Sequence, residues 1–344
     1  DADLRVVPDA VFGATLQYFT GDKRHNVLLR EIALSKGFTL NEYGLFRLKR
    51  RSASDSRRPG ILIVCKTEEE IYQKLGMDMP PPELRVGGDE IEAAQKHELP
   101  HLISYGSVKG DLQTQTEWSD GAASIAEMAR AAQNVGLSYI AVTDHTKSLA
   151  FINGLDDERI AQQMKEIERM NKKNRVFTIF SGTECDIRKD GSLDLSDASL
   201  AQLDWVGVSI HSHFHFSRAE QTKRIIKAIS NPHVDCFFHP TCRLIGKREP
   251  IEFDFDEVLA AAKKHRVAME IDCAPERSDL RDIHVREAVR AGVRLVIDTD
   301  AHAPEHFNFI PLGEAIARRG WARKTDVLNT KTAKELKAYL AKKK

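Results

Sequence analysis

Histidines and carboxylates recur at the ends of short β-branched runs in the 344-residue chain. The residues at or just after the C-terminal ends of these runs are His145, Glu184, His211, His239, Asp300 and His302. Imidazole and carboxylate groups are the ligands that zinc, manganese and iron share. A single histidine at a strand end is ordinarily a hydrogen-bonded structural residue, but recurrence at five strand ends indicates a shared site for several metal ions.

The segment "GDLQTQTEWSDGAAS", residues 110–124, carries two glutamines where a metal site would use two histidines. Gln113 and Gln115 alternate along a predicted strand, so both side chains point to the same face. A carboxamide oxygen can bind a hard cation, but it is a weaker ligand than imidazole for zinc or manganese. Asp120, in the same segment, is either a further ligand or a helix N-cap or turn residue.

A second cluster of histidines lies in "SIHSHFHFS", where His211, His213 and His215 occupy alternate positions. On a continuing strand these side chains would share a face, and His213 or His215 would partly replace the ligands missing at the two glutamines. The alternative is that the chain turns after the strand, which would make both of them loop histidines.

The runs that must position these residues alternate with helical segments. Seven strands are predicted, at residues 110–116, 137–145, 176–184, 205–211, 234–240, 267–272 and 293–302. The helices between them are predicted at residues 121–136, 156–174, 218–231, 255–266 and 280–292. Strands separated by helices of this length predict parallel βα units, and seven of them favour a barrel. In an α/β barrel the active site lies at the C-terminal ends of the strands.

The first 108 residues do not show this regular alternation of strands and helices. Residues 1–82 mix short strands and helices, begin in the strand-like "DADLRVVP", and include a basic hairpin tip over 47–58. Residues 83–108 contain little core-forming sequence and are predicted to be a linker. Because the chain begins abruptly and without methionine, we expect it to be the C-terminal piece of a longer protein.

Composition excludes several classes of protein. The chain has 51 basic and 51 acidic residues, so any binding to a polyanion must come from local patches. The five cysteines are odd in number and scattered, which favours a reducing compartment over a disulfide framework. We find no secretory signal pattern and no apolar run near 18 residues, and we therefore predict a cytoplasmic, nucleoid-associated protein without membrane contact.

The motifs resemble those of two known families. "DLQTQTEWSDG", "AVTDHT", "SGTECDI", "VSIHS", "FFHPT" and "IDTDAH" resemble the PHP (polymerase and histidinol phosphatase) domain. "DLRVVP", "YFTGDKRHNVLLR" and "GFTLNEYGLF" resemble the end of the palm and the nucleotide-binding subdomain of family X DNA polymerases, which in prokaryotes carry a C-terminal PHP domain. The resemblance implies an α/β fold in which a distorted (β/α)7 barrel (109–344) follows a small α+β polymerase subdomain (1–82).

The PHP resemblance implies up to three Mn²⁺ or Zn²⁺ ions. It gives the first ion to the positions of Gln113 and Gln115, together with Glu184 and Asp300. It gives the second ion to Glu184, His211 and His239. It gives the third to Asp120, His145 and His302. Since the glutamines replace half of the first ligand set, we expect that site to be impaired and the phosphodiesterase activity to be weakened or silent.

The polymerase resemblance implies further roles. Asp3 would be one of three carboxylates that hold Mg²⁺ in the full-length polymerase, and the other two are absent, so the chain is not expected to polymerise. The nucleotide-binding residues would be Tyr18, Phe19, Gly21, Asn26 and Arg30. Taken alone, Phe19 is better explained as a core aromatic. DNA contacts would come from Lys23, Arg24, Arg218, Lys223, Arg224 and Arg243.

These features favour the C-terminal part of a gap-filling repair polymerase whose PHP domain is a 3′–5′ exonuclease. Its partners would be gapped or 3′-ended DNA and, in the full-length protein, dNTP, and we expect it to be a monomer. One alternative is a catalytically silent PHP domain that serves as a structural and DNA-binding platform. A small-molecule phosphatase is a further alternative, which the attached polymerase segment disfavours.

Overall fold

The computed structural model describes residues 2–48, 60–174 and 176–342. The chain divides into two compact units, Asp1–His101 and Leu102–Lys344, and each has its own buried apolar cluster. All five cysteines are buried, and none of them forms a disulfide in the described part of the chain. Within the described residues, no helix combines the length and apolar character needed to cross a membrane.

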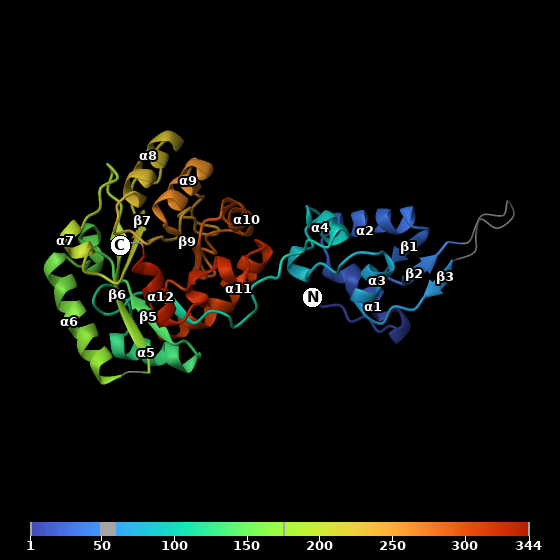
Figure 1. Ribbon diagram of the computed structural model, residues 1–344, viewed down its shortest axis with the longest axis horizontal. Helices are drawn as coiled ribbons and strands as arrows, with labels where there is room; N and C mark the ends of the chain where they lie inside the picture. The colour runs from blue at the N-terminus through green and yellow to red at the C-terminus, as the bar shows by residue number, and fades with distance from the viewer. Residues whose placement is uncertain (1, 49–59, 175, 343–344) are drawn as a thin grey trace. The chain divides into compact units, whose positions relative to one another are not determined.

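The first unit is a small α+β unit built on a three-stranded antiparallel sheet of order β1-β2-β3 (Figure 1). Its elements are α1 (Asp9–Thr20), α2 (Lys23–Ser35), β1 (Phe38–Asn41), β2 (Gly44–Arg47), β3 (Ile61–Ile63), α3 (Glu68–Lys74), η1 (Pro82–Leu84) and α4 (Glu90–Lys96). Leu29, Leu45, Ile71 and Leu75 form part of its fully buried core. Strands β2 and β3 flank the predicted basic hairpin tip (47–58), of which residues 49–58 lie outside the described residues.

Two expectations for this unit differ from the structure. Residues 2–8, which read as a strand, have no secondary structure, and Leu4 and Val6 are 92% and 86% exposed. No described strand lies beside this segment to pair with its backbone, so its β propensity has no effect. The predicted linker over 83–108 instead begins inside the first unit, where it carries α4 and the buried side chains of Leu84 and Ile91.

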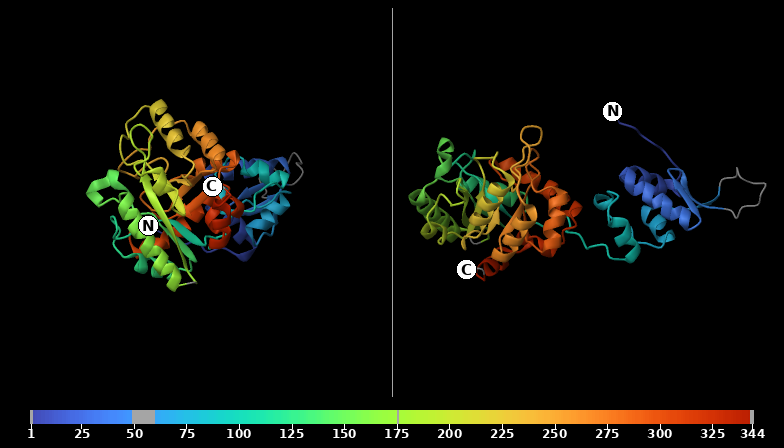
Figure 2. Two further views of the ribbon diagram at one scale, coloured as in Figure 1. Left: turned by 60° about the vertical axis from the view of Figure 1, so that its left-hand side comes forward. Right: turned by 90° about the horizontal axis from the view of Figure 1, so that it is seen from above.

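The second unit is a near-barrel of seven parallel strands, as predicted, in the order β10-β9-β8-β7-β6-β5-β4. The strands are β4 (Gly110–Thr114), β5 (Tyr139–Val142), β6 (Thr178–Asp186), β7 (Trp205–Ser209), β8 (Cys236–Phe237), β9 (Ala268–Asp272) and β10 (Leu295–Asp298). The helices are α5 (Ile125–Asn134), η2 (Lys147–Ile152), α6 (Asp157–Lys173), α7 (Asp197–Leu200), α8 (Arg218–Ile229), α9 (Phe255–His265), α10 (Asp282–Ala291), η3 (Pro304–Phe309), α11 (Ile310–Arg319), η4 (Lys324–Asp326), η5 (Leu328–Thr330) and α12 (Ala333–Leu340). Most of these helices lie outside the strands (Figures 1 and 2).

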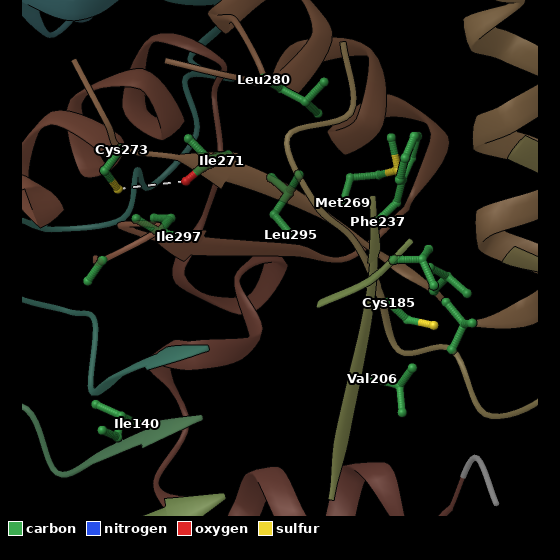
Figure 3. Close-up of a cluster of buried hydrophobic side chains, with 14 of the residues drawn as sticks. Ile140, Cys185, Val206, Phe237, Met269, Ile271, Cys273, Leu280, Leu295 and Ile297 are labelled. Atoms are coloured by element: carbon green, nitrogen blue, oxygen red, sulfur yellow. Dashed lines mark hydrogen bonds between the residues drawn. The ribbon is translucent and has the colours of Figure 1, made fainter. Parts of the chain in front are cut away.

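The strands alternate between two apolar clusters. Ile140, Val206, Met269 and Leu295 belong to one cluster (Figure 3). The same cluster contains side chains of the outer helices. A second cluster takes one or more residues from every strand and, among the helices, only from η5 and α12 within the described residues, so it fills the barrel interior. This alternation is the period-2 pattern of a sheet buried on both faces.

Polar layers follow the apolar layer inside the barrel. On the inward-facing positions of β10 and its continuation, Val296 is followed by Asp298 and then Asp300, and on β9 Glu270 is followed by Asp272. Each of these acidic side chains is at least nine-tenths buried. The alternation therefore places these carboxylates between the apolar cluster of the barrel interior and the C-terminal ends of the strands.

The barrel is closed at one seam mainly by side chains. The end of β4 and the segment that follows β10 meet in a parallel bridge between Thr114 and Ala301. Below that bridge, Asp298 Oδ1 accepts a hydrogen bond from the Leu112 backbone N–H at 2.7 Å. Asp298 thus takes the place of a backbone carbonyl that a regular ladder would supply.

Asn329 completes the seam. Its Nδ2 donates to the carbonyls of Gly110 at 2.9 Å and Ile297 at 2.6 Å, and its Oδ1 accepts from Ile297 N–H at 3.1 Å. The side chain is fully buried. One residue of η5 therefore joins the first and last strands of the barrel.

We predict that Asn329→Ala lowers the free energy of unfolding of the second unit by about 2–4 kcal/mol, because it leaves several buried backbone groups unpaired. The measurement is urea unfolding of the chain in excess chelator. Asn308→Ala is the matched control, since Asn308 is exposed and donates only to the Glu305 carbonyl. Equal stability of the two variants would contradict the role of Asn329 in closing the seam.

Candidate metal centre

Glu184 on β6 lies at the centre of the site and is 1% exposed. Its Oε1 is 2.7 Å from His239 Nε2 and 3.3 Å from His211 Nε2. Its Oε2 is 3.4 Å from His145 Nδ1 and accepts a hydrogen bond from Gln115 Nε2 at 2.8 Å. Side chains from the ends of four other strands therefore converge on one buried carboxylate.

A second group adjoins the first. Asp120 Oδ1 lies 3.7 Å from His145 Nε2, and Asp120 Oδ2 lies 3.6 Å from His302 Nε2. Ligand atoms of Asp120, His145 and His302 all fall within 4.8 Å of one another, as do those of His145, Glu184 and His211. His145 is common to both groups, with one ring nitrogen facing each.

The spacing of these atoms fits metal coordination. Two ligand atoms that each lie about 2.1 Å from a tetrahedral zinc ion are about 3.4 Å apart. Four of the nitrogen–oxygen separations in the two groups lie close to this value, at 3.3, 3.4, 3.6 and 3.7 Å. Imidazole with carboxylate is also the donor set of zinc and manganese. These two groups could therefore each hold a divalent ion.

Neighbouring residues fix how two of the histidines face the site. Asp186 Oδ1 lies 3.2 Å from His211 Nδ1, which directs His211 Nε2 toward Glu184. The Asp300 carbonyl accepts from His302 Nδ1 at 2.7 Å, which directs His302 Nε2 toward Asp120. A partner on the second ring nitrogen is the usual way in which proteins orient a ligating histidine.

The loop that carries Asp120 is held from below by Asp144, which is fully buried. Asp144 accepts hydrogen bonds from the backbone N–H of Thr116 at 2.8 Å, the hydroxyl of Ser119 at 2.6 Å and the amide of Gln163 at 2.6 Å. These bonds connect the end of β4 to α6. Asp144 therefore positions the loop and leaves ligation to its neighbour in sequence, His145.

The protonation states follow from these contacts in the metal-free chain. Burial would lower the pKa of His211, but hydrogen bonds to Asp186 and Glu184 raise it to about 9. Burial would likewise lower the pKa of His302, but Asp300 and Asp120 raise it to about 10. Burial dominates at His239 and lowers its pKa to about 4.

The first ligand set, which consists of Gln113, Gln115, Glu184 and Asp300, does not fit a metal ion. Gln115 donates its amide nitrogen, which is not a ligand, to the Glu184 oxygen that a metal would need. Gln113 is fully buried, and neither of its amide atoms has a hydrogen-bond partner. Asp300 Oδ2 faces the guanidinium of Arg277 at 3.6 Å. The positive charge of Arg277 therefore already lies beside the Asp300 carboxylate of this set.

Two family sequence models match the chain. The model described as DNA polymerase beta thumb matches residues 15–86. The model of the PHP domain matches residues 111–283, which is half of the chain. The chain belongs to the PHP family.

Individual relatives agree with both parts. The chain is 40% identical over 338 residues to the DNA polymerase/3′-5′ exonuclease PolX of Bacillus subtilis (strain 168), and the match covers 98% of this chain and 57% of that protein. It is 30% identical over 247 residues to a protein named "Probable phosphatase" from Thermoanaerobacter sp. (strain X514), covering 68% of this chain and 95% of the relative. The chain thus spans little more than half of the polymerase relative.

Among solved structures, the second unit is similar to the histidinol phosphate phosphatase of Lactococcus lactis, determined with zinc, L-histidinol and phosphate. The identity is 14% and the TM-score 0.45, with 62% of this chain and 93% of that chain covered. The predicted resemblance to a family X polymerase that carries a PHP domain is confirmed by the sequence matches.

The PHP unit contains site residues that the sequence analysis did not identify. The most important are Asp111, Glu270, Asp272, Asp298 and Arg277. Burial raises the pKa of Asp111 to about 7 and that of Glu270 well above its usual range. Acidic residues at alternate positions of a strand buried on both faces were the available signal, as in "AMEID" and "VIDTD".

His213 and His215 do not replace the ligands missing at Gln113 and Gln115, and the alternative, that both are loop histidines, is correct. Strand β7 ends at Ser209, the backbone of His213 is left-handed with φ of 56°, and both side chains are exposed. His213 stacks on Phe216 with ring centroids 5.0 Å apart. They are loop histidines, because the chain turns away after His211.

The predicted DNA-contacting residues fall into three groups. Lys23, Arg24, Arg218 and Lys223 are exposed, although Arg24 and Arg218 pair with Asp22 and Asp254. Arg224 requires a correction: it is 2% exposed and donates to the carbonyls of Arg188, Ser212 and Ile187, so its charge is not available to a phosphate. Arg243 donates to the carbonyls of Arg277 and Ser278 and thus holds the β9–α10 loop.

The predicted nucleotide-binding residues lie together at the end of α1 and the start of α2. Asn26 Nδ2 donates to the Tyr18 carbonyl at 2.8 Å, and Tyr18 meets Phe19 edge-to-face at 5.0 Å. Phe19 is 59% exposed, so its interpretation as a core aromatic is wrong. A Cβ at Gly21 would approach Asn26 Oδ1 to 3.2 Å, and Arg30 is exposed on α2.

We predict that metal binding near pH 7.5 releases about two protons per chain, because ligation requires neutral imidazole. His211 and His302 have pKa values raised above the unfolded value of about 6.5, so the metal-free protein carries both protons at this pH. The apparent metal affinity should therefore rise with pH up to about 9–10. The measurement is calorimetric titration with Mn²⁺ in buffers of different ionisation enthalpy.

The control for this prediction is a pair of histidine variants. His211→Ala should release about one proton fewer, whereas His213→Ala should behave as the parent because His213 lies in the exposed loop. Proton release that is the same in both variants would show that the metal does not displace the His211 proton.

Proposed function

We propose that the PHP unit is a divalent-metal phosphodiesterase of the 3′–5′ exonuclease type, acting on DNA as part of a family X repair polymerase. The supporting observation is the convergence of Asp120, His145, Glu184, His211 and His302 into two adjacent ligand groups. The chain that carries them is 40% identical to a DNA polymerase/3′-5′ exonuclease. The ions would be Mn²⁺ or Zn²⁺.

The residues of the chain have separate tasks in this proposal. Bound divalent ions lower the pKa of water and neutralise charge on the transferring phosphoryl group. Glu184, His211 and His239 would hold one ion. Asp120, His145 and His302 would hold the other ion at the rim, where Asp120 is exposed and accessible to substrate.

The glutamines reduce what this site can do. With Gln115 bonded to Glu184 and Gln113 unpaired, Asp300 is the remaining carboxylate of the first set, and it faces Arg277. We therefore propose a two-ion centre whose activity is weaker than that of a three-ion centre. This same observation favours the second candidate function, a silent PHP domain that serves as a platform for DNA.

The first unit would supply DNA and nucleotide binding in the full-length polymerase. Tyr18, Phe19, Gly21, Asn26 and Arg30 would contact dNTP, and exposed basic residues such as Lys23 and Arg24 would contact phosphates of gapped DNA. Asp3, exposed ahead of α1, would hold Mg²⁺ together with carboxylates from elsewhere in the polymerase. We further propose a monomeric protein that works in the cytoplasm, at the nucleoid.

The test is degradation of 5′-labelled single-stranded DNA by the chain with Mn²⁺. We expect stepwise shortening from the 3′ end that stops with chelator. The rate of shortening should fall more than about 100-fold in Glu184→Gln, because this carboxylate contacts His145, His211 and His239. Glu220→Gln is the matched control, since Glu220 is an exposed capping residue of α8. It should retain parental activity.

Two other results would replace the exonuclease assignment by another function. If the parent and Glu184→Gln are equally inactive but bind gapped DNA alike, the platform function is correct. If the parent instead hydrolyses sugar or amino-alcohol phosphates and leaves DNA intact, the unit is a small-molecule phosphatase, as the name of the Thermoanaerobacter relative suggests for that protein.

A further inference from the structure

We propose that the guanidinium of Arg277 replaces the divalent ion that Gln113 and Gln115 can no longer hold. Arg277 would thus be the residue that sets the number of metal ions bound by the unit. The inference rests on the proposed function, since it concerns the ion that the first ligand set of the same centre would hold, but it depends on metal binding rather than on DNA hydrolysis.

The position of the guanidinium is the first argument. Arg277 Nε lies 3.3 Å from Asp272 Oδ2 and 3.6 Å from Asp300 Oδ2, and the Arg277 side chain is 17% exposed. Asp300 is the carboxylate that the first ligand set would offer to a metal. Arg277 therefore stands where a divalent ion would be attracted, between carboxylates at the ends of two adjacent strands.

The chemistry of the two glutamines agrees with a resident cation. Two buried carboxylates without a counter-ion would be strongly destabilised, and a divalent ion normally prevents this in a metal site. Gln113 and Gln115 are neutral and cannot compensate a carboxylate by charge. A guanidinium can, because it stays protonated and offers donors in several directions.

The loop that carries Arg277 is built to hold it inward. Asp272 N–H donates to the Asp279 carbonyl at 2.5 Å, and Asp279 N–H donates back at 3.2 Å, which closes the loop at its base. Arg277 N–H donates to the Ala274 carbonyl at 2.9 Å, and the Arg277 carbonyl accepts from Arg243 Nε at 2.6 Å. Arg243 is therefore a positioning residue for Arg277.

The test is metal content per chain, by elemental analysis after loading with Mn²⁺ or Zn²⁺ and removal of free ion. The variant Gln113→His/Gln115→His should bind no more metal than the parent, because Arg277 remains in place. The triple variant that adds Arg277→Ala should bind one ion more. Three ions in the double variant, or no additional ion in a folded triple variant, would overturn the proposal.

Stability in chelator provides a second readout. Arg277→Ala in the parent should lower the melting temperature by about 10 °C, since Asp272 and Asp300 lose their cation, and Arg277→Lys should recover part of the loss. Arg248→Ala is the matched control, because Arg248 Nε donates to the Cys242 carbonyl rather than to a carboxylate. An equal loss in Arg248→Ala and Arg277→Ala would contradict the cationic role.

The two proposals fail separately. A chain that gains an ion only when Arg277 is removed, yet never cleaves DNA, would retain this inference and lose the exonuclease assignment. A chain that cleaves DNA with Mn²⁺ but binds a third ion beside an intact Arg277 would do the reverse. If Arg277→Ala does not fold, the metal content of the double variant still decides the proposal.

Discussion

Glu184 is an almost completely buried carboxylate, and it stays ionised only because the groups around it carry or donate positive charge. Burial acts to raise its pKa, but His145, His211 and His239 outweigh burial and hold the pKa well below its usual range. These partners come from the ends of separate strands, so the barrel must bring those ends together. Closure of the barrel and compensation of the Glu184 charge consequently depend on each other.

Much of this arrangement could be predicted from the sequence. Parallel strands between helices must place their C-terminal ends at one edge, so His145, His211, His239 and His302 could be brought together without coordinates. The interior carboxylates were missed because Glu270 and Asp272 read as part of a buried strand, and period alone does not say which alternate face is polar. Arg277 was missed because loop geometry, rather than spacing, turns it inward.

The first unit was less predictable for a different reason. Its helices and its antiparallel sheet follow from local patterns, including the Asp22 cap of α2 and the Thr67 capping box of α3. The prediction failed where tertiary context decides, since the strand-like residues 2–8 find no described partner strand and Phe19 remains exposed. Propensity gives only the conformation that a segment prefers when a neighbour is present to pair with it.

The seam has a consequence for biosynthesis. Asn329 joins the first strand to the last, and Asp300 and His302 stand beyond β10, so the metal centre needs residues from nearly the whole length of the PHP unit. On the ribosome, where domains generally fold in order of emergence, the first unit can fold while the barrel is still open. During that interval the ligating histidines are not yet held at their final separations, so the geometry of the metal centre forms only when Asn329 joins β4 to β10.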